Sequence, residues 1–274
     1  MRKDPKLTLP RNLLLILVSL IATAPLLWIV SLSLRTQQEF AAHPFGVPDR
    51  VNLENYIRVL TDARMVQFIY NSVYVTFWAV LLVFIASTLA GYALARIRFR
   101  GAHALFLLFI LSDAIPVFVV LIPLYILIQK IGLADSRWAL ILTYAAMKVG
   151  LSVFIMRGFF RSVSSAMEDA AQLDGCNLWQ TVWHVMLPLV RPGALVVVIL
   201  NFLSFWNEYF LAAVLLPNQE LFTLPAGLAA VFVGRYATNW PVLATGIFIS
   251  VLPSLGIFAL AQDKIIDGWT VSLK

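Results

Sequence analysis

Residues Met167–Pro192 read MEDAAQLDGCNLWQTVWHVMLPLVRP, and they form the longest helix-like stretch between the strongly apolar runs of the chain. Glu168, Ala171, Gln172 and Gly175 recur at spacings of three and four residues, so they share one face of a short helix. Glycine tolerates a positive φ, which makes Gly175 the residue at which the chain turns. The stretch therefore predicts a short helix followed by a tight turn.

A second helix is predicted directly after this turn. Asn177 has the side chain of a helix N-cap, and the apolar residues Leu178, Val182 and Val185 give the helix one apolar face. Pro188 is expected to end it, because proline removes a backbone donor and crowds the preceding turn. The first helix, the turn and the second helix within residues 167–192 form a rigid unit, called the knuckle below, to which another protein could bind.

The composition of the whole chain indicates a membrane protein. Of its 274 residues, 61% are hydrophobic and only 12% are charged, whereas soluble domains carry about 25% charged residues. The net charge of +6 comes from scattered basic residues without a basic aromatic stripe, so we expect membrane lipid and no nucleic acid around this chain. A single cysteine excludes a disulfide within the chain and a multi-cysteine metal site.

Six apolar runs are each long enough to cross a bilayer, which takes about 20 residues. We expect an all-α integral membrane protein in which residues 1–274 form a single transmembrane domain. A signal peptide competes for the first run, because Ala22 and Ala24 resemble a cleavage site, but the run continues well past them. The predicted spans are about 13–34, 68–95, 103–128, 138–156, 193–216 and 242–261, with the helix-turn-helix loop at about 161–192 between spans four and five.

The basic residues indicate the orientation. Six spans put both termini on one side, and that side, which includes the Glu168 loop, holds twelve of the twenty Lys and Arg residues. Seven lie on the opposite side, and Lys148 lies within a span. By the positive-inside rule, both termini and the Glu168 loop are expected in the cytoplasm.

The central stretch also resembles a known family. The pattern E-x-A-A-x-x-D-G, followed by L-P and then P, is similar to the cytoplasmic coupling loop of ABC importer permeases; it occurs here as Glu168, Ala170, Ala171, Asp174, Gly175, Leu187, Pro188 and Pro192. The resemblance implies that Glu168, Ala171, Asp174 and Gly175 couple this chain to an ATPase subunit. The alternative is an amphipathic helix that merely lies on the bilayer surface.

Further segments extend the resemblance over nearly the whole chain and point to the maltose-type carbohydrate branch. They are Asn52–Tyr56, Gly91–Arg96, Pro123–Tyr125, Phe205–Glu208 and the tail from Gln262 to Lys274, which departs from the usual pattern at Trp269 and Ser272. The resemblance implies a second, different permease subunit, two ATPase subunits and an extracytoplasmic sugar-binding protein. It also implies that ATP and Mg bind the partner ATPase, and that the complex resides in a bacterial or archaeal plasma membrane.

The chain lacks the motifs of an enzyme. It has no G-x-x-x-x-G-K-[ST] sequence for holding ATP, no H-E-x-x-H, no G-x-S-x-G and no paired catalytic carboxylates. We therefore expect a transporter subunit that has no ATPase site, bound cofactor, metal or catalytic residue of its own.

Polar residues inside the predicted spans are the candidates for a substrate path. Asp113 and Lys148 are expected near the middle of spans three and four, where they either form a structural ion pair or line the path. Trp206, Asn207, Glu208 and Tyr209 combine an aromatic face with amide and carboxylate groups, which suits a sugar. An aromatic belt at the membrane interface would produce the same cluster.

The sequence therefore predicts half of the translocation path of an ATP-driven importer of an oligosaccharide or related carbohydrate. An importer of another solute, such as glycerol phosphate or a polyamine, is the first alternative. The second is a proton-coupled secondary transporter that uses Asp113, Lys148 and Glu208. It leaves the Glu168 motif unexplained, and the chain lacks the internal repeat on which many such transporters are built.

Overall fold

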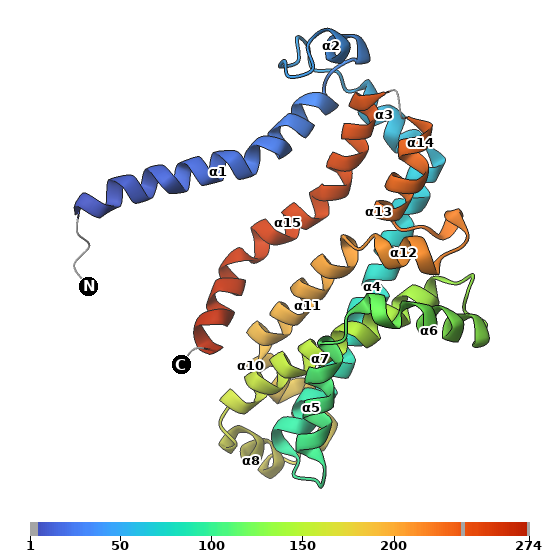
Figure 1. The fold of residues 1–274 in the computed structure, drawn as a ribbon. Helices are drawn as coiled ribbons and strands as arrows, with labels where there is room; N and C mark the ends of the chain where they lie inside the picture. Colours follow the sequence, from blue (N-terminus) through green and yellow to red (C-terminus); the bar gives the residue numbers. More distant parts are fainter. Residues whose placement is uncertain (1–4, 237–238, 273–274) are drawn as a thin grey trace. The chain divides into compact units, whose positions relative to one another are not determined.

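The computed structural model describes residues 5–236 and 239–272, and every regular element within them is helical (Figure 1). Four helical segments are long and apolar enough to cross a membrane, and the number rises to six if each of two bent helix pairs is one span. The four are Arg11–Ser33 in α1 (Pro5–Ser33), Arg64–Arg96 in α4 (Ala63–Arg96), Arg137–Ser162 in α7 (Arg137–Ser162) and Trp240–Leu260 in α15 (Trp240–Ser272).

The chain folds into two compact parts, and α4 and α15 each pass from one part into the other. The first comprises the chain up to Val66 together with Gly227–Pro253. Its elements besides α1 and the ends of the two shared helices are α2 (Gln37–Ala42), α3 (Glu54–Thr61), the π-helix Leu228–Phe232 and α14 (Val233–Arg235).

Arg35 organises the segment that follows α1. Its guanidinium is buried and donates to the backbone carbonyls of Glu39, His43 and Pro44. Asn55 of α3 donates to the carbonyls of Ser33 and Arg35, and Thr245 of α15 donates to the Ser33 carbonyl. The two bonds to Ser33 satisfy a carbonyl at the end of α1, where a helix has no partners of its own.

The second part comprises Gln67–Ala226 and the chain from Ser254 onward. Its central helix is α7, which packs against both α5 (Ala102–Asp113) and α11 (Arg191–Trp206), as Figure 1 shows. Gly150 allows the first contact, because a Cβ at this position would overlap the Phe109 carbonyl of α5. The amide of Asn201 on α11 donates to the Ser152 hydroxyl of α7 (2.9 Å).

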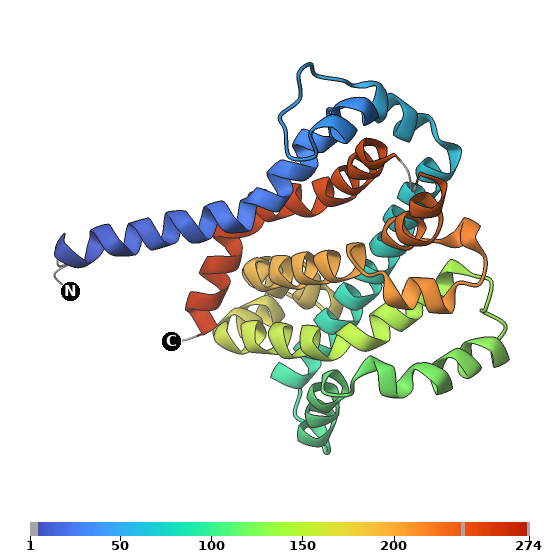
Figure 2. The same ribbon diagram turned by 45° about the horizontal axis from the view of Figure 1, so that its top comes forward.

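The predicted continuous span 103–128 is wrong as a single helix. The structure breaks it into α5 and α6 (Val117–Lys130), which meet at an angle of 100° (Figure 2). Pro116 occupies the N-cap of α6 in an extended conformation. It has no backbone N–H, and it disfavours helical geometry at Ile115, so the helix ends before it.

The predicted span 193–216 is also divided. Helix α11 ends at Trp206, and α12 (Phe210–Leu215) begins after a short break. At its other end α11 meets the preceding helical segment, Leu178–Leu189, at 82°. Pro188 lies in the last short piece of that segment, α10 (Leu187–Leu189), and the segment ends one residue after it, close to the predicted end.

Both ends of the chain contain predictions that fall outside the described residues. Helix α15 continues to Ser272, beyond the predicted end of span six at about residue 261. The tail contacts suggested by Gln262–Lys274 involve side chains that are not described, and the basic residues Arg2 and Lys3 lie outside the described range.

Candidate functional site

The stretch around Gly175 begins with α8 (Ala166–Leu173), whose Ala171 side chain is buried. Gly175 has a φ of +84°, in the left-handed region that favours glycine. The N–H groups of Asp174, Gly175 and Cys176 donate to the carbonyls of Ala170, Gln172 and Ala171. These bonds close the end of α8, as a glycine C-cap does in other helices.

Asn177 starts the second helix. Its side chain accepts from the N–H of Gln180, and the Gln180 side chain accepts from the N–H of Asn177, so the two residues form a capping box. The helix continues from α9 (Leu178–Gln180) through the π-helix Thr181–Met186 to α10. Val182 and Met186 are buried, whereas Leu178, which was predicted on the apolar face, is exposed.

Large apolar side chains are exposed on this knuckle. Leu173 is 89% exposed at the end of α8, and Trp179 is 61% exposed on the second helix. Met167 and Leu178 are exposed as well. Four such residues around one turn form the kind of surface that another protein covers.

Glu168 is already paired within its own chain. Its Oε1 lies 3.3 Å from Nε of Arg96, the last residue of α4, and the two side chains are only 12% and 15% exposed. Arg96 also donates through Nη2 to the carbonyl of Val163, at the end of α7 (2.5 Å). The tyrosine one turn before Arg96, Tyr92, lies beside the same carboxylate. Arg96 therefore fastens α8 to the ends of two membrane-length helices.

Trp206 lies on a different surface from the polar residues next to it in sequence. It is 4% exposed and lines an apolar cavity of about 410 Å³ between α4 and α11, together with Phe77, Phe84 and Phe202. The atoms lining this cavity are almost all apolar. It therefore offers a saccharide almost no hydrogen-bond partners for its hydroxyl groups.

The side chain of Glu208 caps the start of α12. Its carboxylate accepts from the N–H groups of Leu211 (2.7 Å) and Ala212 (3.1 Å) in the first turn of α12, and from the hydroxyl of Tyr144 on α7 (2.6 Å). Asn207 is exposed and bonds Leu203 and Ser254, and Tyr209 is exposed too. Asn207, Glu208 and Tyr209 thus lie at the break between α11 and α12. Their place in a substrate path stays a prediction.

Asp113 and Lys148 do not pair. The ion pairs within the described part of the chain are Arg96–Glu168 and Asp62–Arg235. Asp113 is the last residue of α5 and is exposed, whereas Lys148 is half-buried within α7. The structural ion pair that their matched depth suggested is therefore wrong, and Lys148 keeps a side chain without an acidic partner in the described residues.

The comparison with protein families matches residues 87–262 to the binding-protein-dependent transport system inner membrane component. This range contains α8, the Gly175 turn and Arg96. The chain belongs to this family. It is therefore a multi-pass inner-membrane component of an ABC transporter, and the family resemblance inferred from the Glu168 motif is confirmed.

Relatives of this permease have names that refer to saccharides. It is 35% identical to the diacetylchitobiose uptake system permease protein NgcG of Streptomyces coelicolor, over 92% of this chain and 84% of that one. It is 31% identical to the arabinooligosaccharides transport system permease protein AraQ of Halalkalibacterium halodurans, over 93% and 91%. A solved bacterial ABC transporter involved in the import of the acidic polysaccharide alginate matches with a TM-score of 0.83 and 27% identity, over 96% and 98%.

Sequence reasoning about this permease missed Arg96 as a site residue. From the sequence, Arg96 was identified only as one of the basic residues that indicate the orientation and as the last residue of the segment Gly91–Arg96, which resembles the family. The available signal was its place at the cytoplasmic end of a span, on the side expected to hold Glu168. A charge count cannot identify the partner of a residue, which here is far away in sequence.

Proposed function

We propose that this chain is the permease subunit that forms half of the translocation path in an ATP-driven importer of an oligosaccharide or related carbohydrate. The proposal is supported by the saccharide uptake systems to which NgcG and AraQ belong. Each matches this permease over at least nine-tenths of its length, so the similarity extends over the spans as well as the coupling loop.

The assembly that we propose contains a second, different permease, two ATPase subunits and an extracytoplasmic sugar-binding protein. The chain crosses the membrane six times, where the pair of α5 and α6 forms span three, α11 begins span five after the coupling loop, and both termini are cytoplasmic. ATP and Mg bind the ATPase subunits. The exposed apolar residues Leu173, Leu178 and Trp179 then form the surface that the ATPase covers.

The observation that carries this proposal is the Arg96–Glu168 pair. It fastens α8 to the end of α4, and the Val163 carbonyl bound by the same arginine adds the end of α7. A push on α8 from a closing ATPase therefore reaches two membrane helices through fixed contacts. Such a movement would tilt the bundle between an inward-facing and an outward-facing state.

Lys148 bears on the choice of solute. Lys148 is a half-buried residue with no acidic partner within the described residues, and an unpaired charge within a span commonly faces a cavity. A positive charge there favours an acidic saccharide or glycerol phosphate over a cationic polyamine. An anionic solute is therefore the second candidate.

The test reconstitutes the complete transporter in proteoliposomes with its binding protein and ATP inside. We expect uptake of a labelled neutral or acidic oligosaccharide, and ATP hydrolysis that rises when the loaded binding protein is added outside. Glycerol phosphate and a polyamine serve as competitors that should not reduce uptake. Uptake driven by a proton gradient without ATP would contradict the proposal.

A further inference from the structure

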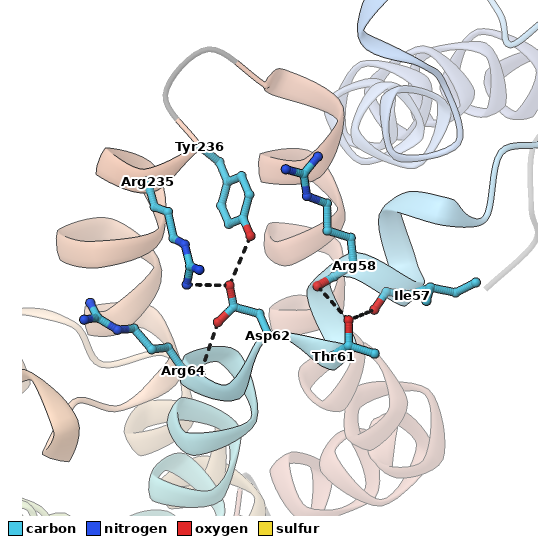
Figure 3. Close-up of polar contacts among 7 residues, drawn as sticks. All are labelled: Ile57, Arg58, Thr61, Asp62, Arg64, Arg235 and Tyr236. Atoms are coloured by element: carbon cyan, nitrogen blue, oxygen red, sulfur yellow. Dashed lines mark hydrogen bonds and ion pairs between the residues drawn. The ribbon is translucent and has the colours of Figure 1, made fainter.

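Three arginines gather around one aspartate in the first compact part of the fold (Figure 3). Asp62 lies between α3 and α4, and Oδ2 of its carboxylate accepts from Nη1 of Arg235 (2.9 Å) and from the hydroxyl of Tyr236 (3.1 Å). Its Oδ1 accepts from the backbone N–H of Arg64 (3.0 Å). The Asp62 side chain is only 5% exposed, so these bonds occupy a carboxylate that is almost removed from water.

The positive charges of this cluster are not balanced. Arg58 and Arg64 are exposed, and neither takes part in an ion pair within the described residues. The guanidinium of Arg58 lies over the Tyr236 ring, 5.3 Å from its centroid, and that of Arg235 is 5.7 Å from it. Among the three arginines, the guanidinium of Arg235 bonds the buried carboxylate, and the exposed side chains of Arg58 and Arg64 add two positive charges that have no ion-pair partner within the described residues.

Structural needs account for only part of this cluster. One arginine is enough to compensate Asp62 and to tie α14 to the start of α4, and the further arginines add repulsion between like charges. Their neighbours Ile57, Leu60 and Val233 are exposed apolar residues. Arginine and aromatic residues beside apolar ones are enriched where proteins bind one another.

The position of the cluster identifies the partner. Asp62 directly precedes α4, whereas Arg96, which holds the coupling helix, is the last residue of the same helix. In the topology proposed above, Asp62 therefore lies outside the cytoplasm. The protein that a binding-protein-dependent system meets on that side is its solute-binding protein.

We propose that Arg58, Arg64 and Arg235 form a docking surface for an acidic face of the extracytoplasmic binding protein. Asp62 and Tyr236 hold the Arg58 and Arg235 guanidinium groups in place, so that little side-chain entropy is lost on binding. Because opposite charges steer association, we expect the surface to act mainly on the rate at which the binding protein arrives. This inference rests on the proposed function.

The test measures binding of the purified binding protein to the complete transporter in nanodiscs made only of zwitterionic lipid. We compare the native chain with the double variant Arg58→Gln/Arg64→Gln, which leaves the Asp62–Arg235 pair intact. The matched control is Arg50→Gln, because Arg50 is exposed and is not among the residues whose contacts with Asp62 or the Tyr236 ring are given above. The double variant should bind about three- to thirtyfold more weakly, with most of the loss in the association rate. Its binding should also depend less on NaCl, whereas the control should behave like the native chain.

Several outcomes would overturn the docking surface. One is an unchanged affinity and salt dependence in the double variant, and another is an equal loss in the Arg50→Gln control. A loss that appears only when anionic lipid is added would assign the arginines to lipid headgroups instead. Unchanged basal ATP hydrolysis will show that the variants assemble. Failure of the native transporter to respond to any binding protein would refute the proposed function, which separates the two failures.

Discussion

The Arg96–Glu168 pair changes the role expected of the glutamate in the coupling motif. A carboxylate on a docking helix invites the idea that it meets a basic group of the ATPase. Here Glu168 is largely buried and bound to an arginine of its own chain, while the apolar side chains of Leu173 and Trp179 in the same knuckle are exposed. Glu168 is therefore placed to anchor α8 within the permease, and under the proposed function we expect residues such as Leu173 and Trp179 to make the contact with the ATPase.

We expect Arg96→Gln and Glu168→Gln each to lower sugar uptake per ATP hydrolysed. Each change leaves a charge without its partner in a poorly hydrated place, at a cost of roughly 1–3 kcal/mol of local stability. The double variant should be more stable than either single variant, because no unpaired charge remains. The measurements are thermal unfolding in detergent and coupled uptake and ATPase assays, combined in a double-mutant cycle.

Arg98→Gln is the control for this cycle, since Arg98 is exposed two residues further along. It should leave uptake and stability unchanged. A coupling energy near zero between positions 96 and 168 would show that these two side chains do not stabilise each other. If Glu168→Gln alone lowered the affinity for the ATPase subunit, this would instead indicate that Glu168 contacts that subunit.

At the scale of elements, the packing of α7 depends on where its glycines lie. Gly150 lies against α5, where an added Cβ would overlap the Phe109 carbonyl and come within 2.6 Å of the Ser112 hydroxyl oxygen. Gly158, on the same helix, has nothing within 4 Å of the position of a Cβ. Backbones that approach closely through small residues are a common way to hold membrane helices together.

We expect Gly150→Ala to destabilise the permease by about 1–3 kcal/mol, because the added methyl pushes α5 away from α7. Gly158→Ala should leave stability unchanged or raise it by up to about 1 kcal/mol, since alanine favours a helix over glycine. The two substitutions are chemically identical, so the difference between their melting temperatures in detergent isolates the packing of α5. Equal effects would contradict the contact.

At the scale of the molecule, the orientation in the membrane decides which surfaces meet which partners. The loop between α2 and α3 and the α8 knuckle lie at opposite ends of the proposed topology. Val47 is exposed in the first, and Asp169 is exposed in the second. Both are accessible positions for a reporter, and neither makes a side-chain hydrogen bond or ion pair that would be lost on substitution.

In a Cys176→Ala background, Val47→Cys should react with a membrane-impermeant maleimide in intact cells, and Asp169→Cys should not. Asp169→Cys should react once the membrane is opened, which controls for reactivity. The positive-inside rule and the coupling loop both require this result. Labelling of position 169 from outside would invert the topology and remove the docking surface from the extracytoplasmic side.

Much of this architecture follows from local sequence. The length of an apolar run indicates a membrane helix whatever its neighbours are, and the Gly175 turn and the Asn177 cap depend on residues within one helical turn. These features, and the family, were therefore predictable from the chain. The segment from Glu168 to Pro192 carries most of that information.

The tertiary structure decided which distant residues meet. Arg96 pairs with Glu168, Glu208 caps α12 while it accepts from Tyr144, and Asp62 draws Arg235 and Tyr236 to the start of α4. In this structure Asp113 and Lys148 do not pair, since α5 ends at Asp113 and the chain changes direction before Pro116. An ionic contact depends on the distance and direction between two side chains, and matched depth in two helices specifies neither. Only the packing of those helices does.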